Sequence, residues 1–589
     1  MNSLDFRLVS SEYKCFEDMP ADNFAVLSRA TVLKNDVFAF EAVITAPESM
    51  DDSEAYIIIN SPIADYVKTY LISGVNVTLG VYENIQDTDY LRGGKPGIYP
   101  DLLTPLDKNT AFKIKAGKTA SVWIEAEIPE SLREGVYPIE VSVRPANGEF
   151  KEEKRALELE VIPAVLPEQK LIFTQWFHCD CLASYYNVEV FSEEHWRIIE
   201  NFVKTAVKNG INMLLMPVFT PPLDTEVGGE RPTVQLVGVT KDGARYSFDY
   251  TLADRWIDMC RRCSVQYYEV SHLVTQWGAA HAPKVMAYEN GVYKKIFGWE
   301  TDSLSDEYLD FIRQFLESFK KYMSEKGLLD KTMFHLSDEP SKEHLERYGK
   351  LRESLEKSLD GCMCADALSN FEFYESGAVK HPIVATDHIE PFIQNGVKDL
   401  WCYYCCGQSE KVANRFIAMS MNRTRVIGAQ LFKFDIRGFL HWGYNFYYTQ
   451  FSKAKLDPYK CNDGGGWVPA GDTFSVYPAP DGTAYESLHM KGFTQALYDL
   501  RAFELLASLT SREYVIDLID STAGENVTFS EYPRYDGFCR QLREAINEHI
   551  KGKIAHGFAA KHRCNTRGPG TSKLYEGFMG LCPKPRPLF

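Results

Sequence analysis

The feature that most constrains the fold is the region from Lys170 onward, where short apolar runs alternate with helical patterns. Amphipathic stretches such as 192–210 and 305–327 separate most of the runs. Buried strands joined by helical crossovers predict a (β/α)8 TIM-type barrel. A doubly wound open sheet is the alternative, but no Gly-rich phosphate loop follows the first run. The runs expected to form strands are 170–177, 211–219, 265–273, 331–337, 361–368, 382–389, 399–406 and 438–446.

The first part of the chain has a different pattern. Apolar and polar residues alternate over 111–145, with breaks at Gly117, Pro129 and Gly135. This pattern predicts an antiparallel β-sandwich. We therefore expect an N-terminal β-sandwich domain over 1–165 and a catalytic barrel with C-terminal helices over 170–550, so the fold class is multidomain, β followed by α/β.

Composition excludes several partners. The net charge of −17 argues against nucleic acid. The amino terminus has no basic start followed by an apolar core, and no apolar run approaches the ~20 residues of a membrane helix. We expect a cytoplasmic protein without a membrane span. Residues 551–589 carry eight Lys or Arg against one acidic residue, and they are expected to be a disordered tail or a segment added by cloning.

The 14 cysteines do not predict a metal site. Cys260 and Cys263 form a CxxC pair, but no second pair follows it at the separation that a zinc site needs. The other cysteines lie largely in apolar runs, as buried thiols do in a reducing compartment. We expect no metal and no organic cofactor.

Two adjacent carboxylates, Asp338 and Glu339, end the fourth expected strand in "HLSDEPSKEHLE". They have a structural interpretation, because Pro340 and early acids suit a helix start. They also have a catalytic one, since active sites of barrels lie at the carboxyl ends of the strands. Position in the barrel favours catalysis.

The seventh expected strand lacks the second acid that a two-carboxylate glycosidase needs at about 5–5.5 Å or 6.5–9.5 Å. Its end, "LWCYYCCGQSEK", offers Tyr403 and Tyr404, and Glu410 lies several residues into the loop. The absence suggests that the substrate supplies the nucleophile, as sugars with a 2-acetamido group do. One carboxylate then stabilises the acetamido N–H, while its neighbour protonates the leaving oxygen.

Residues 1 to about 550 resemble glycoside hydrolase family 123. The resemblance rests on "FTPPLDTEVGGERPTVQLV", "EVSHLVTQWGAAHAPKV", "HLSDEPS", "GFLHWGYNFY" and "WVPAGDTFSVYPAPDG", in this order. It implies a β-sandwich followed by a (β/α)8 barrel, and a retaining β-N-acetylgalactosaminidase. By the same resemblance, Asp338 stabilises the acetamido group and Glu339 is the general acid/base. Glycans with terminal β-GalNAc are the implied substrates, glycosphingolipid glycans among them.

Further pocket residues are expected at the strand ends. They are His178, Asp180, Arg231, His272, Trp277, Tyr403, Trp442, Asn445 and Asp472. Arg231 suits substrate binding and loop bracing equally. Tyr403 and Trp442 are expected to form the sugar platform and the acetamido pocket, and Asn445 and Asp472 to bind hydroxyls. For Asp472, turn formation is the alternative.

The sequence thus predicts an exo-acting β-N-acetylgalactosaminidase. One rival is a β-N-acetylglucosaminidase. A second is a two-carboxylate glycosidase that uses Glu410, Asp366 or Asp387. A third is a noncatalytic glycan-binding protein, in which the acids only cap helices.

Overall fold

The computed structural model describes residues 3–565. Its first part consists of two facing sheets, antiparallel except where β2 lies parallel to β10. Alternating apolar residues such as Phe40, Ile57, Ile124 and Leu159 form the core between the sheets. The strands are β1 Asp5–Ser10, β2 Arg29–Lys34, β3 Asp36–Thr45, β4 Ser53–Asn60, β5 Val67–Val77, β6 Gly97–Pro105, β7 Phe112–Ile114, β8 Thr119–Ile128, β9 Gly135–Pro145 and β10 Glu153–Val165.

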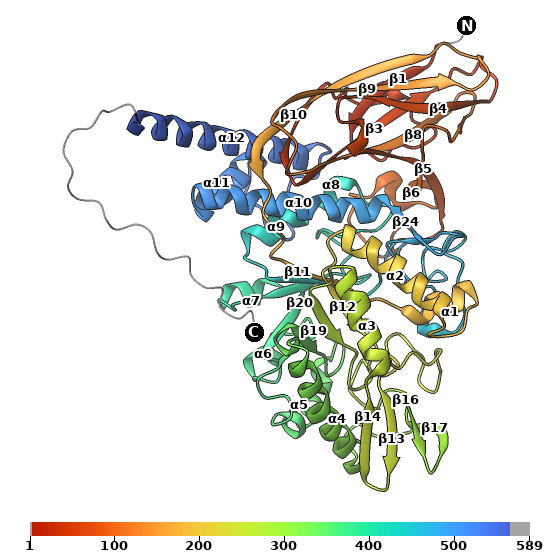
Figure 1. Ribbon diagram of the computed structural model, residues 1–589, viewed down its shortest axis with the longest axis vertical. Coiled ribbons are helices and arrows are strands. Elements are labelled where there is room, and N and C mark those ends of the chain that lie inside the picture. The colour runs from red at the N-terminus through yellow and green to blue at the C-terminus, as the bar shows by residue number, and fades with distance from the viewer. Residues whose placement is uncertain (1–2, 566–589) are drawn as a thin grey trace.

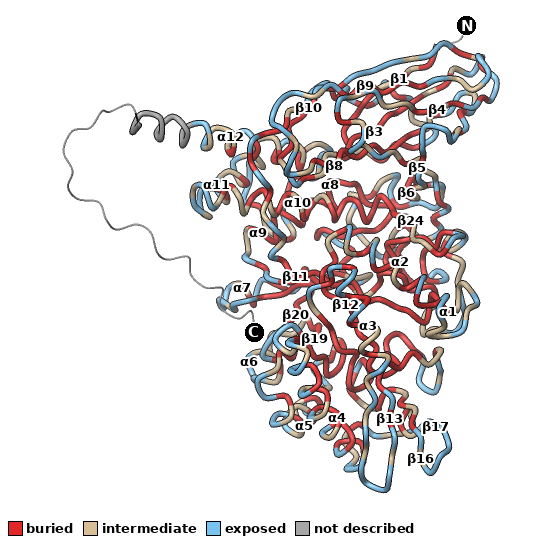
Figure 2. Tube along the Cα trace, in the orientation of Figure 1, coloured by how far each residue is buried: buried red, intermediate tan, exposed pale blue. Residues whose placement is uncertain are grey.

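The larger sheet extends into the second half of the chain. Its order is β1-β3-β8-β5-β6-β24-β23, so β23 (Tyr477–Pro478) and β24 (Ala484–Ser487) add two strands from far along the sequence. The outer face of this sheet packs through Trp123 and Leu103 on Met421 and Leu488. The sheet is therefore buried on both faces, and the two halves of the chain share one interface (Figure 2).

The second part contains a closed barrel of eight parallel strands, and each of the eight predicted runs overlaps one of them. The order follows the chain, and β22 closes on β11. The strands are β11 Ile172–Gln175, β12 Met213–Met216, β15 Tyr267–Val270, β18 Thr332–Phe334, β19 Met363–Leu368, β20 His381–Ala385, β21 Trp401–Tyr403 and β22 Gly438–His441. A parallel barrel is confirmed, and the open-sheet alternative is wrong.

Helices lie in the connections between the barrel strands and after the last of them (Figure 1). They are α1 Cys179–Tyr186, α2 Glu193–Lys208, α3 Thr251–Arg262, α4 Asp306–Glu325, α5 Leu345–Leu355, α6 Glu372–Glu375, α7 Glu390–Gln394, α8 Met421–Arg425, α9 Ile427–Lys433, α10 Leu488–Leu509, α11 Arg512–Ala523 and α12 Phe538–Asn565. Beneath the sandwich, α8 and α10 form a layer between it and the barrel (Figure 1).

Two features differ from the sequence expectations. The connections after β12 and β15 contribute a four-stranded sheet of β13 Gly238–Asp242, β14 Arg245–Asp249, β16 Val285–Glu289 and β17 Val292–Phe297. Its strands alternate weakly because their residues are largely exposed. The start of the expected tail at 551 is corrected, since α12 continues to Asn565. The Gly- and Pro-rich remainder of that tail lies outside the described residues.

No helix in the described part of the chain combines the length and the apolar character needed to cross a membrane.

Candidate active site

Asp338 and Glu339 follow β18 at the carboxyl end of the barrel. Glu339 has a left-handed backbone (φ 42°), which is uncommon outside glycine and breaks the alternation that would point the two side chains apart. Its Oε1 accepts a hydrogen bond of 2.7 Å from the Tyr403 hydroxyl on β21. Tyr403 on β21 therefore meets the pair that follows β18.

Asp338 is 8% exposed, and its carboxylate has no hydrogen-bond partner among the described residues. Burial, with the negative charge of Glu339, raises the pKa of Asp338 well above its usual range. The side chain is thus buried, unpaired and free to bind a donor.

The scaffold interpretation of the same segment is also correct. Ser341 and His344 form a capping box at the start of the helical turn that leads into α5. Tyr348, Leu351 and Leu355 are the buried stripe of α5. The signals for a helix start and the position at the carboxyl end of the barrel strands therefore occur in the same segment.

A chain of polar groups lies beneath the pair in the barrel interior. His335 Nε2 is 2.6 Å from Glu269 Oε1, and its Nδ1 is 3.3 Å from Asp366 Oδ1. Burial opposes protonation of His335, but the Asp366 and Glu269 carboxylates outweigh it and raise the pKa of His335 to about 10. A buried imidazolium therefore lies three residues before Asp338 and offsets part of the negative charge around it.

Glu269 and His335 were not predicted as site residues. Glu269 also accepts hydrogen bonds of 2.6 Å from Thr174 and from the Trp176 indole. A charged residue in the middle of an apolar barrel strand, as in "YYEVSHL", is the sequence signal that would have found it.

His272, predicted after β15, stacks on His335 with ring centroids 4.5 Å apart and packs edge-on against Trp176. Both ring nitrogens are buried without a hydrogen-bond partner among the described residues. Trp277 is linked to the pair through its backbone N–H, which donates to the Asp338 carbonyl at 3.0 Å. Trp277 as a whole residue is 45% exposed, and its ring lies edge-on to Phe451. His272 and Trp277 thus lie beside the pair.

His178, Asp180 and Arg231 form a separate buried cluster. The Asp180 carboxylate accepts from Arg231 Nε and Nη2 at 2.8 and 2.7 Å, and Arg231 Nη2 is 3.1 Å from His178 Nδ1. Arg231 also donates to the Leu223 carbonyl at 3.0 Å. These contacts brace the loop after β12 against α1, which favours the bracing interpretation of Arg231.

Asn445 belongs to that brace. Its amide exchanges two hydrogen bonds with the His178 backbone, at 2.9 and 3.1 Å. Trp442 and Asp472 form another pair, because the Trp442 indole donates to Asp472 Oδ2 at 2.9 Å. Burial raises the pKa of Asp472 to about 7, although Arg415 offsets part of the effect.

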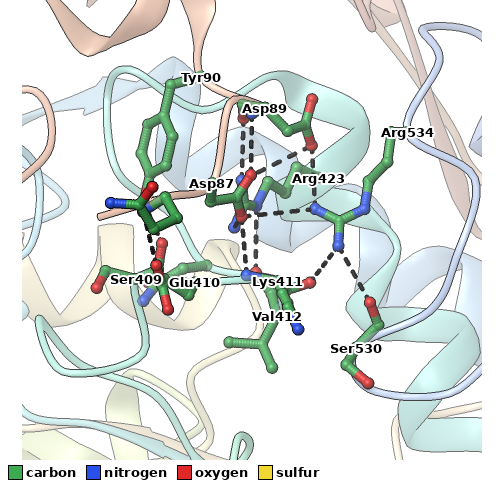
Figure 3. Close-up of polar contacts among 12 residues, drawn as sticks. Asp87, Asp89, Tyr90, Ser409, Glu410, Lys411, Val412, Arg423, Ser530 and Arg534 are labelled. Atoms are coloured by element: carbon green, nitrogen blue, oxygen red, sulfur yellow. Dashed lines mark hydrogen bonds and ion pairs between the residues drawn. The ribbon is translucent and has the colours of Figure 1, made fainter. Parts of the chain in front are cut away.

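A loop of the sandwich supports the loop that follows β21. Asp87 accepts from the Lys411 backbone N–H at 2.8 Å and from Arg423 at 2.7 Å (Figure 3). The Tyr90 hydroxyl donates to the Ser409 carbonyl at 2.6 Å. Arg534 adds a bond to Asp89 at 3.1 Å. The loop that leaves Tyr403 is therefore fixed by the N-terminal half of the chain.

The three acids that could complete a two-carboxylate site have other partners. Glu410 accepts from the Gln86 backbone N–H at 2.7 Å, at the sandwich. Asp366 bonds His335, the Leu336 N–H and the Tyr348 hydroxyl inside the barrel. Asp387 accepts from Gln408 at 2.9 Å.

No cluster of three or more His, Cys, Asp or Glu in the described residues could hold a metal ion.

Comparison with known proteins gives one family. A family model described as glycoside hydrolase 123, catalytic domain, matches residues 176–506. Among solved structures, a family 123 glycoside hydrolase from Clostridium perfringens, studied for the details of glycolipid glycan hydrolysis, superposes with a TM-score of 0.70 at 17% identity. That match covers 96% of this chain and 100% of the other.

The N-terminal domain of PorA is a shorter match, with a TM-score of 0.15 and 7% identity over 27% of this chain and 99% of its own. No curated protein matches the chain.

Proposed function

The chain belongs to glycoside hydrolase family 123 and is a glycoside hydrolase, and from that premise we propose that it is a retaining exo-β-N-acetylgalactosaminidase. In this proposal the acetamido oxygen of the substrate attacks its own anomeric carbon, and a cyclic oxazolinium forms. Asp338 accepts a hydrogen bond from the acetamido N–H. Glu339 protonates the leaving oxygen and then activates the water that attacks the anomeric carbon and opens the oxazolinium ring.

The observation that carries the proposal is the pairing of Asp338 with Glu339 in different surroundings. Glu339 is partly exposed and oriented by Tyr403, which suits a group that exchanges protons with a leaving group and with water. Asp338 is buried without a partner, which suits a group that meets a donor only when substrate binds. This division of roles agrees with the two jobs of substrate-assisted hydrolysis.

The engagement of Glu410 and Asp366 elsewhere supports the substrate as nucleophile. The proposal also includes the finer architecture: a (β/α)8 barrel over 170–550 as catalytic domain, and the sandwich over 1–165 as a domain that holds its loops. The glycan is terminal β-GalNAc. The Clostridium perfringens neighbour, studied with glycolipid glycans, makes glycolipid glycans a substrate class to test.

A panel of aryl glycosides tests the proposal. We expect turnover of aryl β-GalNAc, slower turnover of aryl β-GlcNAc, and turnover of aryl β-galactoside at least about 1,000-fold below that of aryl β-GalNAc, because the nucleophile is then missing. Efficient cleavage of the galactoside would refute substrate assistance. Preference for β-GlcNAc would identify a glucosaminidase, and glycan binding without hydrolysis of any hexosaminide would identify a binding protein.

A further inference from the structure

Another buried carboxylate, Asp224 in the loop after β12, is linked to the Asp338–Glu339 pair through Gln276 and Trp277. Asp224 is 5% exposed, and neither carboxylate oxygen has a hydrogen-bond partner among the described residues. Burial raises its pKa to about 7, although Arg231 and the nearby Phe451 N–H offset part of this. A buried carboxylate without partners is destabilising, so it calls for a functional explanation.

The backbone of Asp224 is held in place from two other loops. Its N–H donates to Gln276 Oε1 at 2.7 Å, and its carbonyl accepts from Ser452 at 2.7 Å. Its φ of 40° lies in the left-handed region that favours glycine. The fold therefore maintains this strained position through contacts with the loops after β15 and β22.

Gln276 supplies the complementary group. Because its Oε1 accepts from Asp224, its Nε2 carries two donors, and this buried atom has no partner among the described residues. The next residue, Trp277, donates its backbone N–H to the Asp338 carbonyl. A dipeptide thus connects the Asp224 position directly to the catalytic pair.

An acceptor-only carboxylate beside a free donor amide matches neighbouring sugar hydroxyls, because each hydroxyl is both a donor and an acceptor. The two groups are buried, whereas Trp277 is 45% exposed. Burial suits the terminal sugar, which an exo-acting enzyme encloses, and exposure suits the rest of the glycan. We propose that Asp224 and Gln276 form a recognition site for adjacent hydroxyls of the terminal sugar and determine specificity. This inference rests on the proposed glycosidase activity.

The test combines enzyme variants with deoxy substrates. Asp224→Asn and wild type are compared on aryl β-GalNAc and on its 3-, 4- and 6-deoxy analogues. We expect Asp224→Asn to lower kcat/KM about 10- to 100-fold on aryl β-GalNAc. On the analogue that lacks the bound hydroxyl, we expect the same substitution to lower it by less than about threefold. An equal loss on all four substrates would overturn the proposal.

The Tm of Asp224→Asn distinguishes substrate recognition from a structural role, because loss of a structural contact would lower the Tm. Asp224→Asn removes an unpaired buried charge, so its Tm should stay unchanged or rise. Asp180→Asn is the matched control, since that buried carboxylate is paired with Arg231, and its Tm should fall. Gln276→Glu keeps the acceptor for the Asp224 N–H but loses both donors, and it should also lower kcat/KM on aryl β-GalNAc.

The outcomes separate the two claims. If wild type cleaves aryl β-GalNAc and Asp224→Asn keeps wild-type kcat/KM, the recognition site is refuted while the proposed function stands. A fall in the Tm of Asp224→Asn with equal losses on every substrate would assign Asp224 a structural role. If wild type cleaves no hexosaminide, both claims fall together.

Discussion

Two regions of this molecule bury many polar and charged groups. In one region these groups are paired with each other, and in the other several of them have no partner among the described residues. At the interface between sandwich and barrel, Lys491 bonds Glu125 and Glu486 at 2.7 and 2.8 Å. Arg425 bonds Asp499 at 2.6 Å. At the barrel mouth, both carboxylate oxygens of Asp224 and both ring nitrogens of His272 lack partners among the described residues.

Whether a buried charged group has a partner distinguishes groups that stabilise the fold from groups available to a ligand. A buried ion pair with good geometry is satisfied internally and has nothing left for a ligand. An unpaired buried group lowers stability, and a fold keeps it when binding or catalysis uses it. The Asp180–Arg231 pair shows that both kinds of group occur within the mouth, because it braces a loop that carries Asp224.

The largest expected effect comes from the catalytic pair. Glu339→Gln should lower turnover of natural glycans about 100- to 10,000-fold, because a general acid contributes that much. The Tm should change little, since the hydrogen bond that Glu339 accepts from Tyr403 can still form to an amide oxygen. Steady-state kinetics with calorimetry measures both. An unchanged rate on glycans would remove Glu339 from the mechanism.

At the interface, breaking a pair should affect stability instead of chemistry. Arg423→Met removes the cation that lies 2.7 Å from the largely buried Asp87 side chain and leaves Arg534 at 3.9 Å, so we expect about 3 kcal/mol of destabilisation in the free energy of unfolding. Arg534→Met is the control in the same network; its side chain is 30% exposed, so a much smaller effect is expected. Denaturant unfolding measures both. Equal losses of stability in the two variants would contradict the expectation that the buried ion pair contributes more than the partly exposed one.

Tyr403 tests whether a hydrogen bond to the acid matters. Tyr403→Phe should lower kcat/KM about tenfold, because the hydrogen bond that orients the Glu339 carboxyl is lost. The neighbouring Tyr404 is the matched control, since its buried hydroxyl has no partner among the described residues. Tyr404→Phe should keep wild-type kinetics. A loss as large as that of Tyr403→Phe would indicate a packing effect.

The smallest effect concerns pH. Asp338 must be ionised to accept the acetamido N–H, and its pKa lies above the usual range for a carboxyl because of burial and Glu339. Therefore kcat/KM should rise with pH through that raised pKa. His335 lowers the pKa of Asp338, whereas Asp366 and Glu269 raise it. His335→Gln should then move the rise to higher pH, and a shift to lower pH would contradict the arrangement. Calorimetry checks that the variant is folded.

The sequence was sufficient for the barrel because its strands are buried on both faces and read as continuous apolar runs. It also predicted the Asp338–Glu339 junction, since helix-start residues and strand position agree there. It did not predict that β24 would join the sandwich, because four residues carry too little pattern. The recognition atoms of Asp224 and Gln276 depend on contacts between three loops, and no local pattern reports such contacts.

The central claim is that Asp338 and Glu339 have separate roles, and the dependence of the rate on the leaving group tests it most directly. Aryl β-GalNAc substrates with phenols of graded acidity are compared for Glu339→Gln and Asp338→Asn. We expect the loss in Glu339→Gln to shrink steeply as the phenol becomes more acidic, because acid assistance matters less. The loss in Asp338→Asn should stay nearly constant, because stabilisation of the acetamido group is needed for every leaving group. Parallel dependence in the two variants would contradict the assignment of separate roles.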